Sequence, residues 1–206
     1  MKLPDYIKFP VVLIIVAAIA AVVLAWLYKV TLPTKLRIQA QITQSAYKIV
    51  MPDASKFEDA KAEVDGAPFE YKVAKNGSGE VIGYIGEGAA EGYSSKLRIM
   101  VGVKKDFTIN AIKVLYQKET PGLGDKVNEI LSKKTWWTVI NGTSPDEAGL
   151  RPWFQIQFDG KKMPVKVQKD GGAIDAITGA TISSRAVCHA VNEAIADLRK
   201  AVESSK

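Results

Sequence analysis

The segment from Phe9 to Tyr28 constrains this chain most, because it is a run of apolar side chains without a single charged residue. At about 1.5 Å per residue, a helix over this range is roughly 30 Å long, which matches the hydrocarbon core of a bilayer. Trp26 and Tyr28 lie at one end, where interfacial aromatic side chains are common, and a lysine brackets the run on each side. We therefore predict a transmembrane anchor at residues 1–30, with the folded part of the chain after it.

A cleaved signal peptide is the main alternative, because Ala18-Ile19-Ala20 offers a small-x-small cleavage site. Apolar residues continue well past that site, which favours a retained anchor. Basic residues occur on both sides of the segment, so the positive-inside rule does not fix its orientation.

Composition excludes several classes of function. The net charge of +6 is spread over isolated lysine pairs rather than a basic stripe interleaved with aromatics, so we expect no nucleic-acid partner. The single cysteine, Cys188, excludes an internal disulfide and a cysteine-ligated cluster, and we expect it to be buried. The single histidine, His189, argues against a zinc site, and we place it on a helix surface. We predict no catalytic or metal-ligating residue.

After the anchor, the sequence predicts a helical stalk and connector over residues 31–66. Pro33 is expected to break the first helix, because proline lacks the backbone donor that a helix interior needs. A mixed polar and apolar helical pattern then runs from Thr34 to about Val50, and residues 57–64 are expected to form another short helix.

Residues 67–206 are predicted to form one α+β domain with an antiparallel sheet and flanking helices. Alternating apolar and polar residues indicate the strands, and the turn at residues 76–79 indicates a hairpin. The glycine-rich residues 86–92 are interpreted as a loop, residues 125–133 as a short helix, and residues 184–202 as a closing helix. The expected strands are residues 69–73, 81–85, 97–103, 108–115 and 153–158, with residues 163–167 paired to the last of them.

The run Asp175-Ala176-Ile177-Thr178-Gly179-Ala180-Thr181 is a small-residue turn that ends in a hydroxyl just before the closing helix. A helix N-terminus has unpaired N–H groups and a positive dipole end, so it suits a phosphate. The simpler interpretation is that Thr181 only caps the helix, because threonine oxygens accept from such N–H groups.

The same run resembles the flavinylation motif of bacterial FMN-binding domains. In that family, a separate flavin transferase joins FMN through its phosphate to the hydroxyl of the final threonine, which implies covalent FMN on Thr181. A second element, Glu119-Thr120-Pro121-Gly122-Leu123-Gly124, reads as a tight turn by itself, and the resemblance implies that it lies against the flavin. The expected cofactor-binding residues are Thr181, Asp175, Ile177, Thr178, Gly179, Ala180, Glu119, Thr120, Gly122, Leu123 and Gly124.

Together with the anchor, the two motifs resemble the G-subunit family of Rnf-type ion-translocating complexes. The resemblance implies an electron-relay subunit in the inner membrane, single-pass, with its flavin domain on the extracytoplasmic side. The implied partners are the other membrane, flavin and iron–sulfur subunits of the complex, the flavin transferase and the lipid bilayer. Two alternatives remain: the related C subunit of a sodium-translocating NADH:quinone oxidoreductase, and a non-redox membrane-tethered binding module.

Overall fold

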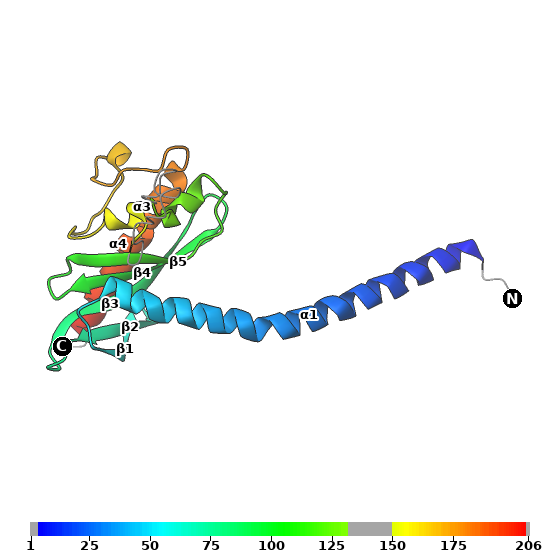
Figure 1. Ribbon diagram of the computed structural model, residues 1–206, viewed down its shortest axis with the longest axis horizontal. Coiled ribbons are helices and arrows are strands. Elements are labelled where there is room, and N and C mark those ends of the chain that lie inside the picture. The colour runs from blue at the N-terminus through cyan, green and yellow to red at the C-terminus, as the bar shows by residue number, and fades with distance from the viewer. Residues whose placement is uncertain (1–3, 132–149, 205–206) are drawn as a thin grey trace, which may run out of the picture. The chain divides into compact units, whose positions relative to one another are not determined.

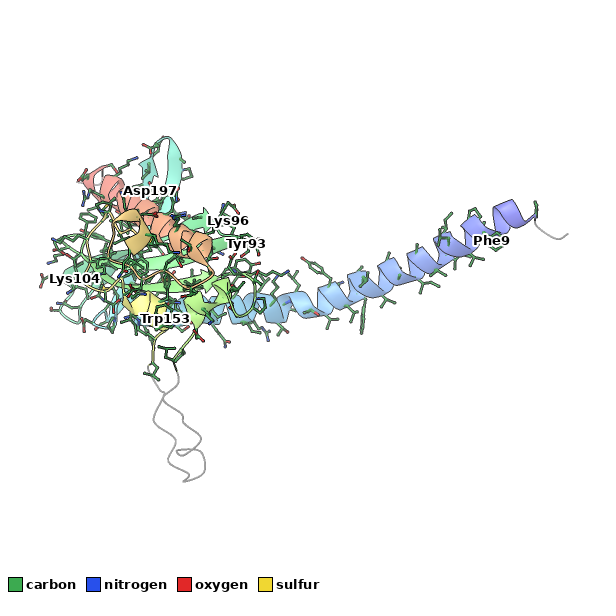
Figure 2. All side chains as sticks on the ribbon, turned by 90° about the horizontal axis from the view of Figure 1, so that it is seen from above. Phe9, Tyr93, Lys96, Lys104, Trp153 and Asp197 are labelled. Atoms are coloured by element: carbon green, nitrogen blue, oxygen red, sulfur yellow. The ribbon has the colours of Figure 1, made fainter. Side chains whose placement is uncertain are left out.

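The computed structural model describes residues 4–131 and 150–204, and the chain divides into two compact units, residues 1–44 and 45–206. The first unit is the larger part of helix α1 (Asp5–Val50). Apolar side chains project from all sides of this helix, as Figure 2 shows around Phe9, which is 70% exposed. With a mean hydropathy of 2.9 over its most apolar window, α1 is long and apolar enough to cross a membrane. The predicted apolar helix near the N-terminus is therefore confirmed.

Helix α1 is continuous through Pro33, so the predicted break at this residue is wrong. Proline removes one backbone donor, which bends or weakens a helix but does not have to end it when the turns on either side keep their hydrogen bonds. In the turn before Pro33, the Thr31 hydroxyl also donates to the Leu27 carbonyl at 2.7 Å. The predicted boundary between anchor and stalk is thus not an interruption of secondary structure.

The second unit is built on a five-stranded antiparallel sheet in which each strand pairs with the next along the chain (Figure 1). The predicted α+β class with an antiparallel sheet is confirmed, as are the first four strands that the alternation indicated. The strands are β1 (Lys56–Val64), β2 (Ala67–Lys75), β3 (Val81–Glu91), β4 (Lys96–Lys104) and β5 (Ile109–Tyr116).

Strand β1 occupies residues that the sequence predicted to be helical. Its alanines and glutamates are good helix formers, but propensity is a weak prior that pairing overrides. All nine residues of β1 pair with β2. Ala60 and Ala62 pack against the core, and the residue on either side of each alanine is charged. Ion pairs such as Lys61–Glu70 and Lys75–Glu58, both 2.6 Å, join the two strands. The sequence analysis therefore missed the alternation of apolar and charged side chains along β1, which is typical of a strand.

The glycine-rich residues 86–92 are strand β3 up to Glu91, not the predicted loop. The close backbone packing that the glycines suggested is present, because β3 lies directly beneath the closing helix. A Cβ atom on Gly86 would lie 2.8 Å from a Leu198 carbon, and one on Gly88 would meet the Ala190 carbonyl oxygen. Small residues here serve helix-on-sheet packing.

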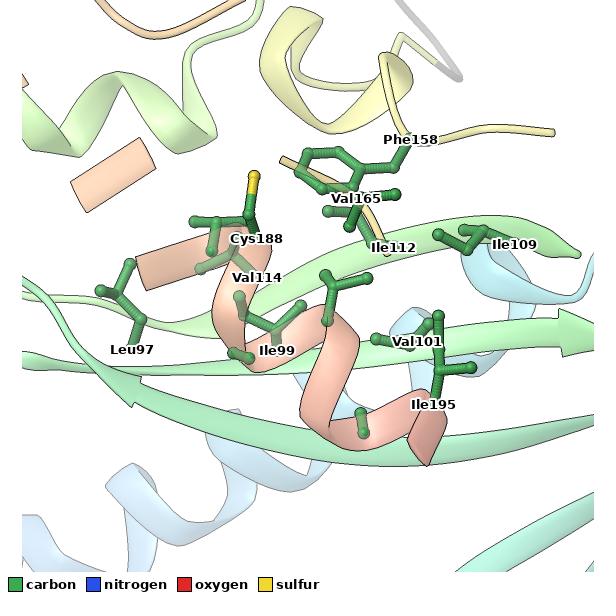
Figure 3. Packing of buried hydrophobic residues seen from close by; sticks show 14 of the residues in the cluster. Leu97, Ile99, Val101, Ile109, Ile112, Val114, Phe158, Val165, Cys188 and Ile195 are labelled. Atoms are coloured by element: carbon green, nitrogen blue, oxygen red, sulfur yellow. The ribbon is translucent and has the colours of Figure 1, made fainter. Parts of the chain in front are cut away.

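Helix α4 (Thr181–Ser204) covers one face of the sheet and confirms the predicted closing helix. Its apolar side enters a core formed with alternate residues of β4 and β5, including Ile99, Val101 and Ile112, all fully buried (Figure 3). Cys188 lies in this core at 4% exposure, as predicted, and the His189 side chain is 74% exposed on the outer side of the helix.

The other face of the sheet is covered in part by the last turn of α1, which belongs to the same unit. Ala46, Val50 and Met51 form a small buried cluster there with Met100. The Asn110 side-chain amide donates to the Val50 carbonyl oxygen at 2.8 Å, which satisfies one of the acceptors left unpaired at a helix end.

Residues 153–158 begin a short helix, α3 (Trp153–Ile156), instead of the predicted strand. The buried side chains here are four residues apart, which is a helical spacing: Phe154 and Phe158 are both buried, and their ring centroids lie 5.7 Å apart. The buried Gln155 amide donates to the Val127 carbonyl at 2.8 Å. Residues 163–167 consequently have no strand to pair with, and Val167 forms only a parallel bridge with Ile174.

The predicted short helix at residues 125–133 is a 3₁₀ turn, η1 (Gly124–Asn128), and residues 132–133 lie outside the described part of the chain.

Candidate functional site

A cavity of about 460 Å³ lies at the N-terminus of α4, where the two sequence motifs meet. One wall comes from the 119–124 segment, another from residues 179–183, and the β3–β4 connection and a loop before the motif add one residue each. The lining residues are Tyr93, Glu119, Thr120, Leu123, Gly124, Lys169, Gly179, Ala180, Thr181, Ile182 and Ser183.

The 119–124 segment forms a turn between β5 and η1. Its backbone reverses at Gly122, whose φ of +77° favours glycine, and the Leu123 amide donates to the Thr120 carbonyl at 3.1 Å. The turn leaves Leu123 at the cavity with 43% of its surface exposed. A large apolar side chain at the mouth of a cavity is suited to a flat aromatic ligand.

The Glu119 carboxylate ties three segments together behind the cavity. It is 6% exposed and accepts the backbone N–H groups of Tyr93, Ser94 and Ser95 at 2.9–3.1 Å. It also accepts the hydroxyls of Ser95 at 2.9 Å and Ser183 at 2.6 Å. Burial acts to raise the pKa of Glu119, but these donors outweigh it and hold the pKa below its usual value. Glu119 thus carries its charge inside the protein and fixes the shape of the site.

The second motif packs around Ser184, which lies in the first turn of α4. The Ile177 amide donates to the Ser184 hydroxyl, which in turn donates to the Ala180 carbonyl, both at 3.0 Å. Ile177 is anchored in the core at 2% exposure. Gly179 has a φ of +79°, and a Cβ atom there would lie 3.1 Å from a Leu123 methyl group. The glycine brings the two motifs into contact across the cavity.

Thr181 is the first residue of α4, and it lines the cavity. Its hydroxyl accepts a hydrogen bond from the Lys169 ammonium at 3.3 Å. Among residues 4–131 and 150–204, no backbone N–H donates to this hydroxyl, so the simple capping role does not describe it. The local serine, Ser184, makes the backbone contacts instead.

The structure brings both motifs to one cavity but does not place all expected residues on its wall. Glu119, Thr120, Leu123, Gly124, Gly179, Ala180 and Thr181 line it. The others do not line it: Ile177 is buried in the core, and Asp175, Thr178 and Gly122 are exposed.

Four lining residues were missed by the sequence analysis. Ile182 and Ser183 directly follow the motif, and their position next to Thr181 was the available signal. Tyr93 and Lys169 reach the cavity only through the tertiary fold, and nothing in their own sequence neighbourhood marks them.

A comparison with protein families decides what this site belongs to. The sequence profile of the FMN-binding domain family matches residues 92–196, which include every residue that lines the cavity. The chain belongs to the FMN-binding domain family. The family match agrees with the resemblance read from the two motifs.

Similar proteins from other organisms share one name within this family. The chain is 32% identical over 194 residues to the G subunit of the ion-translocating oxidoreductase complex of Methanosarcina acetivorans, covering 91% of this chain and 92% of that protein. It is 37% identical over 142 residues to the corresponding protein of Aliivibrio fischeri, and there it spans only 59% of the relative's length. A crystal structure of Shewanella oneidensis NqrC is similar with a TM-score of 0.43 and 20% identity, over 69% of this chain and 66% of that one.

The residues at the cavity fit FMN. The volume of about 460 Å³ lies within the roughly 300–1,000 Å³ typical of small-molecule sites. Leu123 and Tyr93, 43% and 71% exposed, offer apolar and aromatic surface for a ring system. The Thr181 hydroxyl and the Lys169 ammonium, from two other lining residues, offer a phosphate an attachment point and a positive charge.

Proposed function

We propose that this chain is a membrane-anchored electron-transfer subunit of an Rnf-type ion-translocating oxidoreductase, with FMN linked through its phosphate to Thr181. The observation that carries the proposal is that Thr181 lines the cavity shared by both motifs and that its hydroxyl does not serve as a helix cap. The G-subunit relatives supply the class of complex. Residues 1–30 act as the anchor, the rest of α1 connects it, and the domain that contains the sheet holds the cofactor.

In this proposal the protein positions the cofactor and sets its surroundings. Bound FMN can accept two electrons and pass them on singly, so it connects two-electron and one-electron partners. Leu123 and Tyr93 hold the ring, and Gly179 leaves space beside Leu123. Gly124 allows the turn to pack against Glu119 and Ser183. Glu119 keeps the three surrounding segments in place through its five hydrogen bonds.

Asp175 serves the attachment of FMN rather than its binding. Within the described residues, no group donates a hydrogen bond to its carboxylate, and its backbone instead exchanges bonds with the Gln157 side chain at 2.7 and 3.3 Å. An exposed, unpaired carboxylate just upstream of Thr181 is available to a flavin transferase and the metal ion that it uses. A carboxylate close to the phosphate itself would be repulsive.

The chain acts as a relay between neighbouring subunits that carry other flavins or iron–sulfur clusters. It has one cysteine and one histidine, and its sequence has no dinucleotide-binding fingerprint. We place its flavin domain on the extracytoplasmic side of the inner membrane. The C subunit of a sodium-translocating quinone reductase is the second candidate, because that family shares the same motifs.

Acid denaturation tests this function. The full chain is expressed with a flavin transferase, purified in detergent and precipitated with acid. The yellow colour is expected to stay with the polypeptide, and dithionite but not NADH is expected to reduce the purified protein. A colourless precipitate would favour the alternative of a non-redox binding module, and rapid reduction by NADH alone would contradict the relay.

A further inference from the structure

Lys169 reaches the cavity from a short loop that nothing in the sequence connects with Thr181. The loop runs from Val167 to Ile174, which form a parallel bridge at its base. Two backbone hydrogen bonds close its turn. The Gly171 amide donates to the Gln168 carbonyl, and the Gly172 amide donates to the Val167 carbonyl, both at 3.0 Å. Backbone hydrogen bonds therefore set the path of this loop.

An ion pair fixes the loop against α4. The Arg185 guanidinium donates two hydrogen bonds to the Asp170 carboxylate, at 2.8 and 2.7 Å, one residue after Lys169 and one turn into α4. These bonds hold the pKa of Asp170 below its usual value. A bidentate pair has a defined geometry even at the surface. It therefore fixes the loop relative to α4 and so brings the Lys169 ammonium to the Thr181 hydroxyl.

No other charged side chain competes for this ammonium at the cavity, among the residues that the structure describes. Asp170 is held by Arg185, and the carboxylate of Glu119, the one acidic residue among those that line the cavity, is occupied by its five donors. Lys169 itself is exposed and makes only a single hydrogen bond, to an uncharged hydroxyl, among the described residues. Such a cation is available to an anion that arrives at Thr181.

We propose that Lys169 is the counter-cation of the phosphoester on Thr181, an inference that rests on the function proposed above. In the ester, Thr181 Oγ1 loses its proton and replaces one oxygen on the phosphorus of FMN, which is a net loss of one water, and the resulting diester keeps one negative charge. Its unesterified oxygens come within reach of an ammonium that already lies 3.3 Å from Oγ1. Hydrogen bonds between a charged donor and a charged acceptor are about twice as strong as neutral ones. The loop thus places the positive charge for a phosphate next to Thr181 before the cofactor is attached.

Phosphorus NMR of the flavinylated full chain, in a detergent without phosphorus, tests this role. The diester has no ionisation of its own near neutral pH, so its resonance reports nearby charges. At one pH near neutrality, the resonance of Lys169→Gln is expected to lie at a different position from that of the unaltered chain, because this variant lacks the ammonium beside the ester.

Two further variants separate a local charge effect from a structural one. Lys166→Gln makes the same change three residues away at an exposed lysine outside the cavity, and its resonance should lie where it does in the unaltered chain. Lys169→Arg keeps a positive charge beside the ester, so its resonance should lie closer to that of the unaltered chain than that of Lys169→Gln does. An unchanged resonance in Lys169→Gln, or an equal displacement in Lys166→Gln, would overturn the proposal. Absence of any protein-bound phosphorus signal would instead refute covalent FMN, and this inference with it.

Discussion

Replacing Glu119 by glutamine should destabilise the domain although it changes only one atom. The carboxylate accepts five hydrogen bonds, three at one oxygen and two at the other. A glutamine can keep its oxygen on the side of Ser94 and Ser95, but its NH₂ group then faces the Tyr93 amide, which is also a donor. Ser183 can rotate its hydroxyl to accept, whereas the Tyr93 amide cannot.

The expected cost follows from these contacts. An unsatisfied buried donor costs about 1–3 kcal/mol, and hydrogen bonds to a charged group lose about half their strength when the charge is removed. We therefore expect Glu119→Gln to lower the free energy of unfolding by roughly 2–4 kcal/mol, and Glu119→Ala to lower it further. Urea unfolding of the full chain in detergent at pH 7, followed by tryptophan fluorescence, measures the difference. The control is Glu91→Gln, an exposed residue that should change stability by less than about 0.5 kcal/mol.

The pH dependence gives a second test of the same reasoning. Because the folded-state pKa of Glu119 is lower than its unfolded value, its stabilisation is complete above the unfolded pKa and is lost as pH falls through the folded one. The stability difference between the unaltered chain and Glu119→Gln should therefore shrink as the pH falls below about 4. Equal stabilities at pH 7, or a difference that stays constant down to pH 3, would refute the role assigned to this carboxylate.

Three further predictions concern the core and the membrane anchor. Gly88→Ala should destabilise the domain by about 1–3 kcal/mol or more, because its Cβ would meet the Ala190 carbonyl, whereas Gly77→Ala, with its nearest contact at 3.7 Å, should cost little in the same unfolding assay. Cys188 should resist alkylation in the folded protein at pH 8 and react only after denaturation, because burial raises the pKa of its thiol to about 12; rapid labelling of the native chain would contradict this. A phosphatase that is active only outside the cytoplasm should be active when fused after Lys206, and activity of a cytoplasm-dependent reporter instead would show the opposite orientation.

The parts of the fold that could be predicted from the sequence are those whose pattern is local. Strands β2 to β5 show alternation or apolar runs between turn residues, and α4 has apolar residues at helical spacing. Strand β1 was missed because its alanines and glutamates favour a helix until pairing with β2 overrides them. Helix α3 was missed because its aromatic residues also fit alternation, and only burial of Phe154 together with Phe158 separates the two periods.

The candidate site divides in the same way. Thr181 and the 119–124 turn are recognisable because each motif is contiguous in sequence. The two motifs line one cavity because strand β5 of the sheet ends next to the start of α4, and the 119–124 turn follows β5. The contacts of Glu119 with Ser183, and of Lys169 with Thr181, join residues far apart or on separate loops. Such pairings are set by tertiary packing, so local patterns carry no trace of them.

The most direct test of covalent FMN on Thr181 is the mass of the intact chain after expression with a flavin transferase. We predict an increase of one FMN less one water over the sequence mass, and fragmentation should place this increase on Thr181. In Thr181→Ala the increase should be absent although the protein still folds, as judged by its unfolding transition. An increase that persists in this variant, or that maps to a different hydroxyl, would contradict the central claim.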